Sequence, residues 1–190
     1  MPEARSERVW TYKDYLNWPE GERWELIEGT AYSMTPAPSW RHQQITGELY
    51  LQIRLCLEKH PCKTVTAPID VRLAESDSAD KDVTNVVQPD VVVVCDSSKI
   101  DDRGIKGPPD IAIEVISPSS ATRDTIDKRI LYERYCVPEY WVVDVDNERV
   151  FVFVLKNNRY ANPNILQRTD RLESVHHSKI RIDLERLFIE

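Results

Sequence analysis

The chain has 190 residues, of which 41% are hydrophobic and 30% are charged, as is usual for one globular domain. This composition excludes a disordered or fibrous protein, and a chain of this length can bury a core that needs no disulfide or metal to fold. The formal net charge of −7 argues against a protein that simply coats nucleic acid, because phosphate binding usually requires a basic domain. We therefore expect a single domain over residues 1–190, with residues 1–8 as a flexible polar arm.

The cysteines predict neither a disulfide framework nor a zinc site. Cys56, Cys62, Cys95 and Cys136 include no pair with CxxC spacing. Cys95 ends an apolar run, where a reduced, buried thiol is expected.

The N-terminal residues lack the apolar stretch of a signal peptide. No segment reaches the roughly 18 apolar residues of a membrane span. A cytoplasmic protein with no membrane contact is the simplest expectation.

The first third of the chain predicts a short helix, a hairpin and a long helix. Residues 11–17 form the short helix, and residues 24–27 and 31–34 form a hairpin with a glycine in its turn. Ser39 is a plausible N-cap for a helix over residues 39–59. Its predicted apolar stripe consists of Ile45, Leu49, Ile53 and Leu57, widened by Leu55 and Cys56.

The rest of the chain predicts a sheet with one crossover helix. A helix capped at residues 119–122 extends to about residue 136, with Ile126, Ile130 and Leu131 facing inward. The strands on either side of it complete a βαβ unit with parallel pairing. We therefore expect an α/β fold with a mixed β-sheet flanked by helices. The predicted strands are residues 64–73, 86–95 (interrupted near Pro89), 111–117, 140–145 and 150–155, the last in an antiparallel hairpin.

Glu114 is the most informative residue for function. It lies in the run Ile111–Ile116, which is apolar on both faces, as strands buried on both sides are. A carboxylate there loses hydration at a cost of several kcal/mol unless it is paired or bound to a metal. We therefore predict that Glu114 has a use.

Asp90 is a second acid at an unusual place. It follows Pro89, which cannot donate a hydrogen bond, and it precedes four consecutive valines. Asp90 and Glu114 on neighbouring strands would offer the oxygen ligands that Mg²⁺ prefers. Lys128, on the helix after the Glu114 strand, could orient a water molecule or offset charge developing on a phosphate.

At this point the sequence resembles the "putative restriction endonuclease" family of the PD-(D/E)xK nuclease superfamily, over roughly residues 10–160. The matching residues are Gln88-Pro89-Asp90, Glu114-Val115-Ile116-Ser117-Pro118-Ser119, Lys128 with Tyr132, Glu139-Tyr140-Trp141-Val142-Val143-Asp144, Trp24-Glu25-Leu26-Ile27-Glu28-Gly29 and His42.

The resemblance implies a restriction-endonuclease-like domain that uses Mg²⁺, or Mn²⁺ as a substitute, to hydrolyse phosphodiester bonds. It implies Asp90 and Glu114 as metal ligands, with Lys128 as the catalytic lysine. Glu25 and His42 are possible auxiliary residues. One departure is Ile116, which stands where the simplest superfamily pattern has its lysine, so Lys128 from the following helix is the expected substitute.

The residues also allow structural explanations. Glu114 could be a buried acid paired with Arg123 or another basic group, and Asp90 could cap the start of a strand. Lys128 could be a solvated helix residue paired with Asp124, a contact worth only about 0.2–0.5 kcal/mol.

Several other residues carry weaker expectations. His176 and His177 are adjacent, so in a strand they would point apart and would not share a metal. The aromatic group Trp10, Trp18, Trp24 and Trp40 is expected to pack in a core or an interface rather than stack on bases. Substrate contacts are expected from Arg123, Arg129 and Lys106.

The expected function is a Mg²⁺-dependent endonuclease acting on nucleic acid, with DNA favoured, as a homodimer. One alternative is a catalytically silent module of the same fold for nucleic-acid binding or protein assembly. Others are a metal-free hydrolase that uses the two acids as glycosidases do, and a protein that pairs with a partner chain. The motifs GxSxG, HExxH, Walker A and GxGxxG are absent from the sequence.

Overall fold

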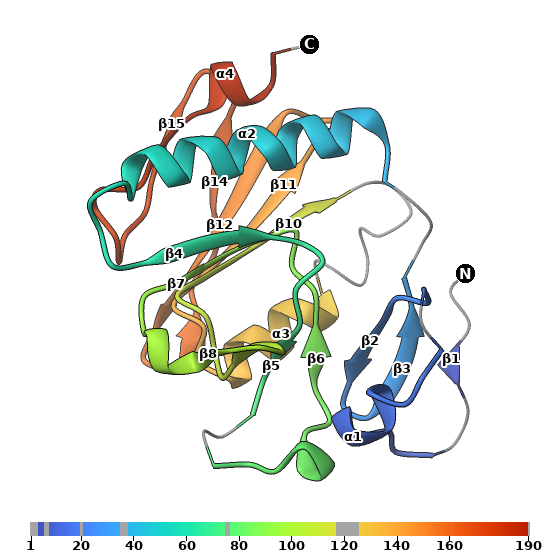
Figure 1. The fold of residues 1–190 in the computed structure, drawn as a ribbon. Coiled ribbons are helices and arrows are strands. Elements are labelled where there is room, and N and C mark those ends of the chain that lie inside the picture. Colours follow the sequence, from blue (N-terminus) through green and yellow to red (C-terminus); the bar gives the residue numbers. More distant parts are fainter. Residues whose placement is uncertain are drawn as a thin grey trace.

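The structure of the protein is a computed structural model, and it describes residues 4–5, 8–19, 21–34, 38–74, 77–116 and 126–189 (Figure 1). The predicted helix cap at residues 119–122, the side chain of Arg123 and most of the predicted N-terminal arm lie outside these ranges. No helix in the described ranges is both long enough and apolar enough to cross a bilayer.

A central mixed sheet carries the middle of the chain. Its order is β13-β12-β11-β10-β7-β4, with β14 also paired to β12, so β4 forms one edge. The strands are β4 (Lys63–Thr66), β7 (Val91–Val94), β10 (Ile111–Ile116), β11 (Glu139–Asp144), β12 (Arg149–Lys156), β13 (Arg159–Tyr160) and β14 (Asn164–Gln167).

The predicted βαβ unit is confirmed. Strand β10 leads through α3 (Lys128–Arg134) to β11, and the two strands pair in parallel with Glu114 opposite Val142. Strands β11 and β12 then form the predicted antiparallel hairpin, in which Asp144 faces Arg149.

Helices cover both faces of this sheet, as Figure 1 shows. On one face Ile113 joins a core cluster with Leu49 of α2 (Trp40–Cys56). On the other face Ala112 joins a cluster with Leu131 of α3. Because successive residues of a strand point to opposite faces, β10 serves both cores and is buried along its whole length. The predicted fold class is confirmed.

A second sheet packs beside α3, with the order β1-β3-β2-β6-β5-β9-β8. Val71, Val87 and Ile105 from this sheet join the same core cluster as Leu131. Its strands are β1 (Ala4–Arg5), β2 (Trp24–Ile27), β3 (Thr30–Ser33), β5 (Val71–Arg72), β6 (Val86–Val87), β8 (Ile100–Asp101) and β9 (Gly104–Lys106).

Two predicted strands are each divided between the two sheets. The expected strand over residues 86–95 is β6 in the second sheet and β7 in the central sheet, with Pro89 and Asp90 between them. The expected strand over residues 64–73 is divided in the same way into β4 and β5, with a cis peptide bond at Ala67–Pro68. Apolar composition could not reveal these crossings, since both halves are buried.

Short elements complete the described structure. The predicted helix near the N-terminus is confirmed as α1 (Tyr12–Tyr15), capped by Thr11, and the predicted hairpin is β2–β3, with Glu28 and Gly29 at positive φ in its turn. The others are 3₁₀ turns at Asp80–Asp82 and Ser97–Lys99, the hairpin β15 (Arg171–Glu173) and β16 (Arg181–Asp183), and α4 (Leu184–Leu187).

Core packing of the early tryptophans is confirmed in part. Trp24 is buried, and Trp10 and Trp18 pack against its cluster on the outer side of the second sheet. Trp18 lies edge-on to both Trp10 and Trp24. Trp40 contradicts the expectation, because it is 85% exposed in the first turn of α2.

Three predicted inward-facing residues point outward instead. Leu55 is 60% exposed, because it lies two residues and therefore about 200° around the helix from the buried Ile53. Ile126 and Ile130 are 49% and 47% exposed, since α3 turns its Lys128–Leu131–Tyr132 face to the core. The sequence did not indicate this inward face, because its first residue, Lys128, is charged.

The expected reduced thiol at Cys95 is wrong. Cys95 forms a disulfide with Cys62, with their Cα atoms 3.8 Å apart. The register of β4 and β7 pairs Lys63 with Val94, and one step further it sets these cysteines opposite each other. Sequence spacing could not show this pairing, which depends on two strands 33 residues apart.

The register of α2 can be tested by paired truncations. Leu49→Ala should lower the free energy of unfolding by about 2–5 kcal/mol, because Leu49 is fully buried. Leu55→Ala, on the exposed side of the same helix, should change it by less than about 0.5 kcal/mol. Urea unfolding measures both values, and equal effects would contradict the register.

Asp144 should make stability depend on pH. Burial raises the pKa of Asp144, but hydrogen bonds from Asn147 and Arg149 outweigh burial and hold the pKa below its ordinary value. A lowered pKa means that the carboxylate stabilises the fold above its unfolded pKa of about 3.9, and that this stabilisation is lost as the pH falls through the folded value. Asp144→Asn should therefore cost about 1–2 kcal/mol at neutral pH and progressively less below pH ~4.

The control for this experiment is Asp146→Asn, at an exposed position of the same turn. Denaturant unfolding at several pH values should show no comparable loss for it. A pH-independent cost of Asp144→Asn would refute the assigned role of the charge.

Candidate functional site

A buried lysine joins two carboxylates in the interior. Lys128 Nζ lies 2.8 Å from Glu25 Oε1 and 2.9 Å from Glu114 Oε1. The three side chains are at most 4% exposed, and they come from α3, β2 and β10. Buried charges are tolerated only when they are well paired and hydrogen-bonded, so this triad fixes how the second sheet meets the central one.

Further donors complete the environment of the two glutamates. Tyr132, one turn after Lys128, donates its hydroxyl to Glu114 Oε1 at 3.1 Å. Burial, and then the negative charge of Glu114, raise the pKa of Tyr132 well above its usual value, so it remains a hydroxyl donor. The backbone N–H of Gln88 donates to Glu25 Oε1 at 2.8 Å.

Asp90 lies where the chain crosses from one sheet to the other. Its Oδ2 accepts a hydrogen bond of 2.8 Å from the backbone N–H of Val115 and lies 3.3 Å from His42 Nε2. Its Oδ1 forms no hydrogen bond to any described residue, and the side chain is 20% exposed. Asp90 is therefore held at Oδ2 by one contact from β10 and one from α2.

The strand register brings Asp90 beside Glu114. Strands β7 and β10 are antiparallel, with Val91 opposite Ile113. Continued by one residue, this register sets Asp90 opposite Glu114, and the Val115 N–H bond holds the Asp90 carboxylate against the β10 backbone.

His42 is held on the other side of Asp90. It lies in the first turn of α2, after the N-cap Ser39, whose hydroxyl oxygen accepts from its backbone N–H. Its ring Nδ1 lies 3.5 Å from Thr46 Oγ1, and its Nε2 faces Asp90. The sequence suggested no partner for His42, because its contact is with a residue 48 positions further along the chain.

Among the predicted site residues the structure places two groups in direct contact: Lys128 with Glu25 and Glu114, and Asp90 with His42. The hydrogen bond from the Val115 backbone N–H to Asp90 ties the second group to β10, the strand that carries Glu114. The view of Lys128 as a solvated helix residue is wrong, because its side chain is 3% exposed. The alternative explanation described Glu114 as a buried acid paired with a basic group. Glu114 does contact a basic group, and that group is Lys128.

The carboxylates of this region offer oxygen donors. Glu25 and Glu114 contact the Lys128 ammonium group, and Asp90 lies between the β10 backbone and His42. Carboxylate oxygens are the hard ligands that Mg²⁺ prefers, so Asp90 and Glu114 are the residues that could hold such an ion.

Two contributors to this region were not predicted to have a role of their own. The hydroxyl of Tyr132 and the backbone of Gln88 were noted only as parts of a motif. Among the predicted substrate contacts, Arg129 lies over the Phe153 ring at 5.9 Å, and Lys106 lies on β9 of the second sheet. No interaction within the described ranges connects either of them to Glu25, His42, Asp90, Glu114 or Lys128.

The sequence matches a family model over most of its length. The model, Uma2, is described as "Putative restriction endonuclease" and matches residues 12–185. The chain belongs to this family. The predicted family is therefore confirmed.

A solved structure shares the fold. It is a crystal structure from Anabaena variabilis ATCC 29413 described as "a putative nuclease belonging to DUF820", with a TM-score of 0.74 and 18% sequence identity. The match covers 94% of this chain and 97% of that chain. No curated protein matches the chain.

Removal of the buried lysine should expose the dependence of the fold on this triad. Lys128→Met leaves Glu25 and Glu114 without their shared cation, so the free energy of unfolding at neutral pH should fall by about 3–5 kcal/mol. Adding Glu25→Gln should recover part of the loss, because one fewer buried charge remains unpaired. Chemical unfolding followed by circular dichroism measures both.

The matched control is Arg129→Met, which removes the neighbouring cation of the same helix. It should cost less than about 1 kcal/mol, as for other exposed or partly exposed charges. A similar cost for the two variants would contradict a structural role of the triad.

Proposed function

We propose that the protein is a Mg²⁺-dependent endonuclease that hydrolyses phosphodiester bonds in nucleic acid, with DNA as the expected substrate. The observation that carries the proposal is the register of β7 and β10, which sets Asp90 opposite Glu114, while Glu114 and Glu25 share the buried Lys128. The family and the fold support the reaction class, because both are described in terms of nucleases.

In this proposal Asp90 and Glu114 hold the ion. Their strands are neighbours, and the backbone carbonyl of Val115 is a further ligand candidate between them. Glu25 adds negative charge close to Lys128 and completes the acidic environment. When bound, Mg²⁺ would act as a Lewis acid toward a phosphate oxygen and favour ionisation of water, and Mn²⁺ could replace it.

The other residues would orient the site. Lys128 fixes the carboxylates of Glu25 and Glu114 and places a positive charge where a water molecule could be held or phosphate charge offset. His42 holds Asp90 from the side of α2, and is therefore a positioning residue. Lys128 takes the place of the lysine that the simplest superfamily pattern would put at Ile116.

A catalytically silent member of the family is the second candidate. Its supporting observation is that Lys128 is engaged with both glutamates inside the core, so the cluster is a coherent structural unit by itself. Such a protein would bind nucleic acid or a partner chain without cleaving either.

The active form is expected to be a cytoplasmic homodimer. Two copies of the chain would supply two sites, one for each strand of a duplex.

A plasmid assay tests the proposal. The purified protein should nick or cut supercoiled plasmid or single-stranded DNA with Mg²⁺ or Mn²⁺, and a chelator should abolish the cleavage. Asp90→Asn and Glu114→Gln should each lower the rate about 100-fold or more, as when a group that stabilises the transition state is removed. Gel electrophoresis over time gives the rates.

Matched controls separate catalysis from charge. Asp146→Asn removes an exposed acid and Lys156→Met an exposed lysine, so both should cut like the parent, whereas Lys128→Met should not. Cleavage that survives a chelator would favour metal-free acid–base chemistry. A parent that binds Mg²⁺ but cuts neither DNA nor RNA would favour the silent module.

A further inference from the structure

Ligand-type side chains gather at the end of β7 that is remote from Asp90. Cys95 directly follows β7, and Cys62 directly precedes β4, so the disulfide joins two neighbouring strands at their ends. Asp90 and Cys95 flank a four-residue strand, which separates them by roughly 16 Å. The cluster is therefore distinct from the proposed nuclease site.

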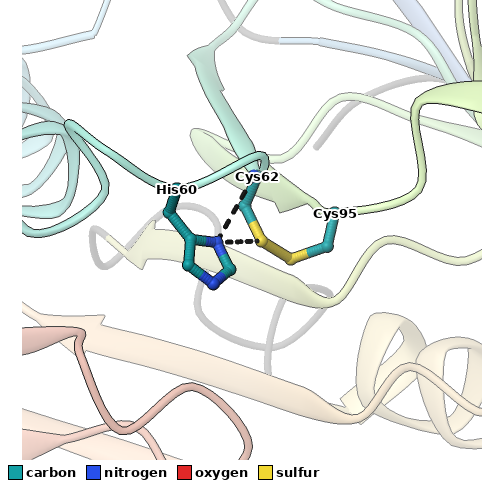
Figure 2. Close-up of side chains that lie close together, drawn as sticks. All are labelled: His60, Cys62 and Cys95. Atoms are coloured by element: carbon teal, nitrogen blue, oxygen red, sulfur yellow. Dashed lines mark hydrogen bonds between the residues drawn. A yellow bond between two sulfur atoms is a disulfide. The ribbon is translucent and has the colours of Figure 1, made fainter.

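His60 faces the sulfur of Cys62. Its Nδ1 lies 3.0 Å from Cys62 Sγ, and it accepts a hydrogen bond of 3.4 Å from the Cys62 backbone N–H (Figure 2). An acceptor nitrogen carries a lone pair, so the ring presents a metal-ligating atom beside the sulfur.

His177 faces the sulfur of Cys95. Both ring nitrogens lie 3.9 Å from Cys95 Sγ, and Nε2 also lies 3.5 Å from Asp110 Oδ1. Asp110 is fixed in turn, because its Oδ2 accepts from the Cys95 backbone N–H at 2.7 Å. A histidine that contacts a carboxylate through one ring nitrogen and directs the other to a metal is a frequent arrangement in zinc proteins.

We propose that Cys62, Cys95, His60 and His177 form a Zn²⁺ site when the disulfide is reduced. The set of two thiolates and two imidazoles is one that tetrahedral structural zinc sites use. Zinc–ligand bonds of about 2.0–2.3 Å place the donor atoms about 3.5 Å apart, close to the contacts of each histidine with its sulfur. The donors form two groups that share Cys95, one with His60 and Cys62 and one with His177 and Asp110, so metal binding would draw His177 toward the first group. Reduction lets the two sulfurs separate to such a spacing.

Reduction of the disulfide would precede metal binding. Two molecules of a small thiol reductant transfer two electrons and two protons to the disulfide, giving two cysteine thiols and one small-molecule disulfide. Zn²⁺ binding then releases the two thiol protons to solvent, and the neutral imidazoles contribute lone pairs. Oxidation of the thiolates by a disulfide reverses the process and releases the ion.

The site would join segments that are distant in sequence. His60 and Cys62 lie between α2 and β4, Cys95 follows β7, and His177 lies in the loop between β15 and β16. The ion would therefore connect the C-terminal hairpin to the central sheet, which the disulfide does not do.

Metal binding to the full chain tests the proposal. Protein reduced with excess thiol should bind one Zn²⁺ per chain in the presence of excess Mg²⁺, whereas oxidised protein should not bind it. Substitution with Co²⁺ should give the visible absorption of a tetrahedral site with thiolate ligands. A reduced protein without stoichiometric Zn²⁺ would overturn the proposal.

Histidine variants that keep the disulfide identify the ligands. His60→Ala and His177→Ala should each weaken Zn²⁺ binding at least about tenfold, and Asp110→Asn should weaken it about 10–100-fold. His176→Ala and Cys136→Ser are the matched controls, because both residues are exposed and neither belongs to the cluster. Thermal unfolding confirms that each variant is folded.

Asp90→Asn keeps the Zn²⁺ test separate from the proposed nuclease activity, since it should leave Zn²⁺ binding unchanged. Loss of Zn²⁺ in this variant, or equal affinities of His176→Ala and His177→Ala, would contradict the assignment.

Discussion

The contact of Lys128 with Glu25 and Glu114 is the constraint on which the rest of this structure depends. It joins one side chain from each of α3, β2 and β10, and all three side chains are almost completely buried. A buried charge without its partner is costly, so the second sheet, the crossover helix and the central sheet have one relative arrangement that satisfies all three groups. Hydrophobic packing alone would tolerate small shifts between these layers, whereas this ionic contact requires a defined separation. The same contact fixes Glu114 on β10, at the register position opposite Asp90.

The crossing of the chain between sheets explains how Asp90 reaches that position. Pro89 has no N–H to give to a ladder, so the segment between β6 and β7 leaves one sheet and enters the other without losing a strand hydrogen bond. Asp90 then substitutes its side chain for a strand partner by accepting from the N–H of Val115. A local interruption in regular pairing thus creates a place for a carboxylate, and the buried strands on either side hold it in position.

Much of the fold could be predicted from local patterns. The periodicity of α2, the apolar run of β10 and the order of β10, α3 and β11 are properties of short segments, and they fixed the fold class. The candidate acids stood out because charge in an apolar run is costly. What could not be predicted depends on pairing between distant segments: the division of residues 86–95 between sheets, the inward face of α3, and the Cys62–Cys95 disulfide. The role predicted for Lys128 rested mainly on the family resemblance, because a lysine on a helix usually faces solvent.

The position of β4 at the border of the central sheet has a consequence for solubility during folding. A border strand presents unpaired N–H and C=O groups, which can template the addition of strands from other molecules. Here that strand has only four residues, begins with the exposed Lys63 and is followed by Pro68. The brevity of the strand, the charge of the lysine and the missing donor of the proline all oppose intermolecular β-pairing. At the opposite edge of the sheet the short strands β13 and β14 pair with β12. The described part of the sheet therefore has no long, apolar edge strand on which fibrils could start.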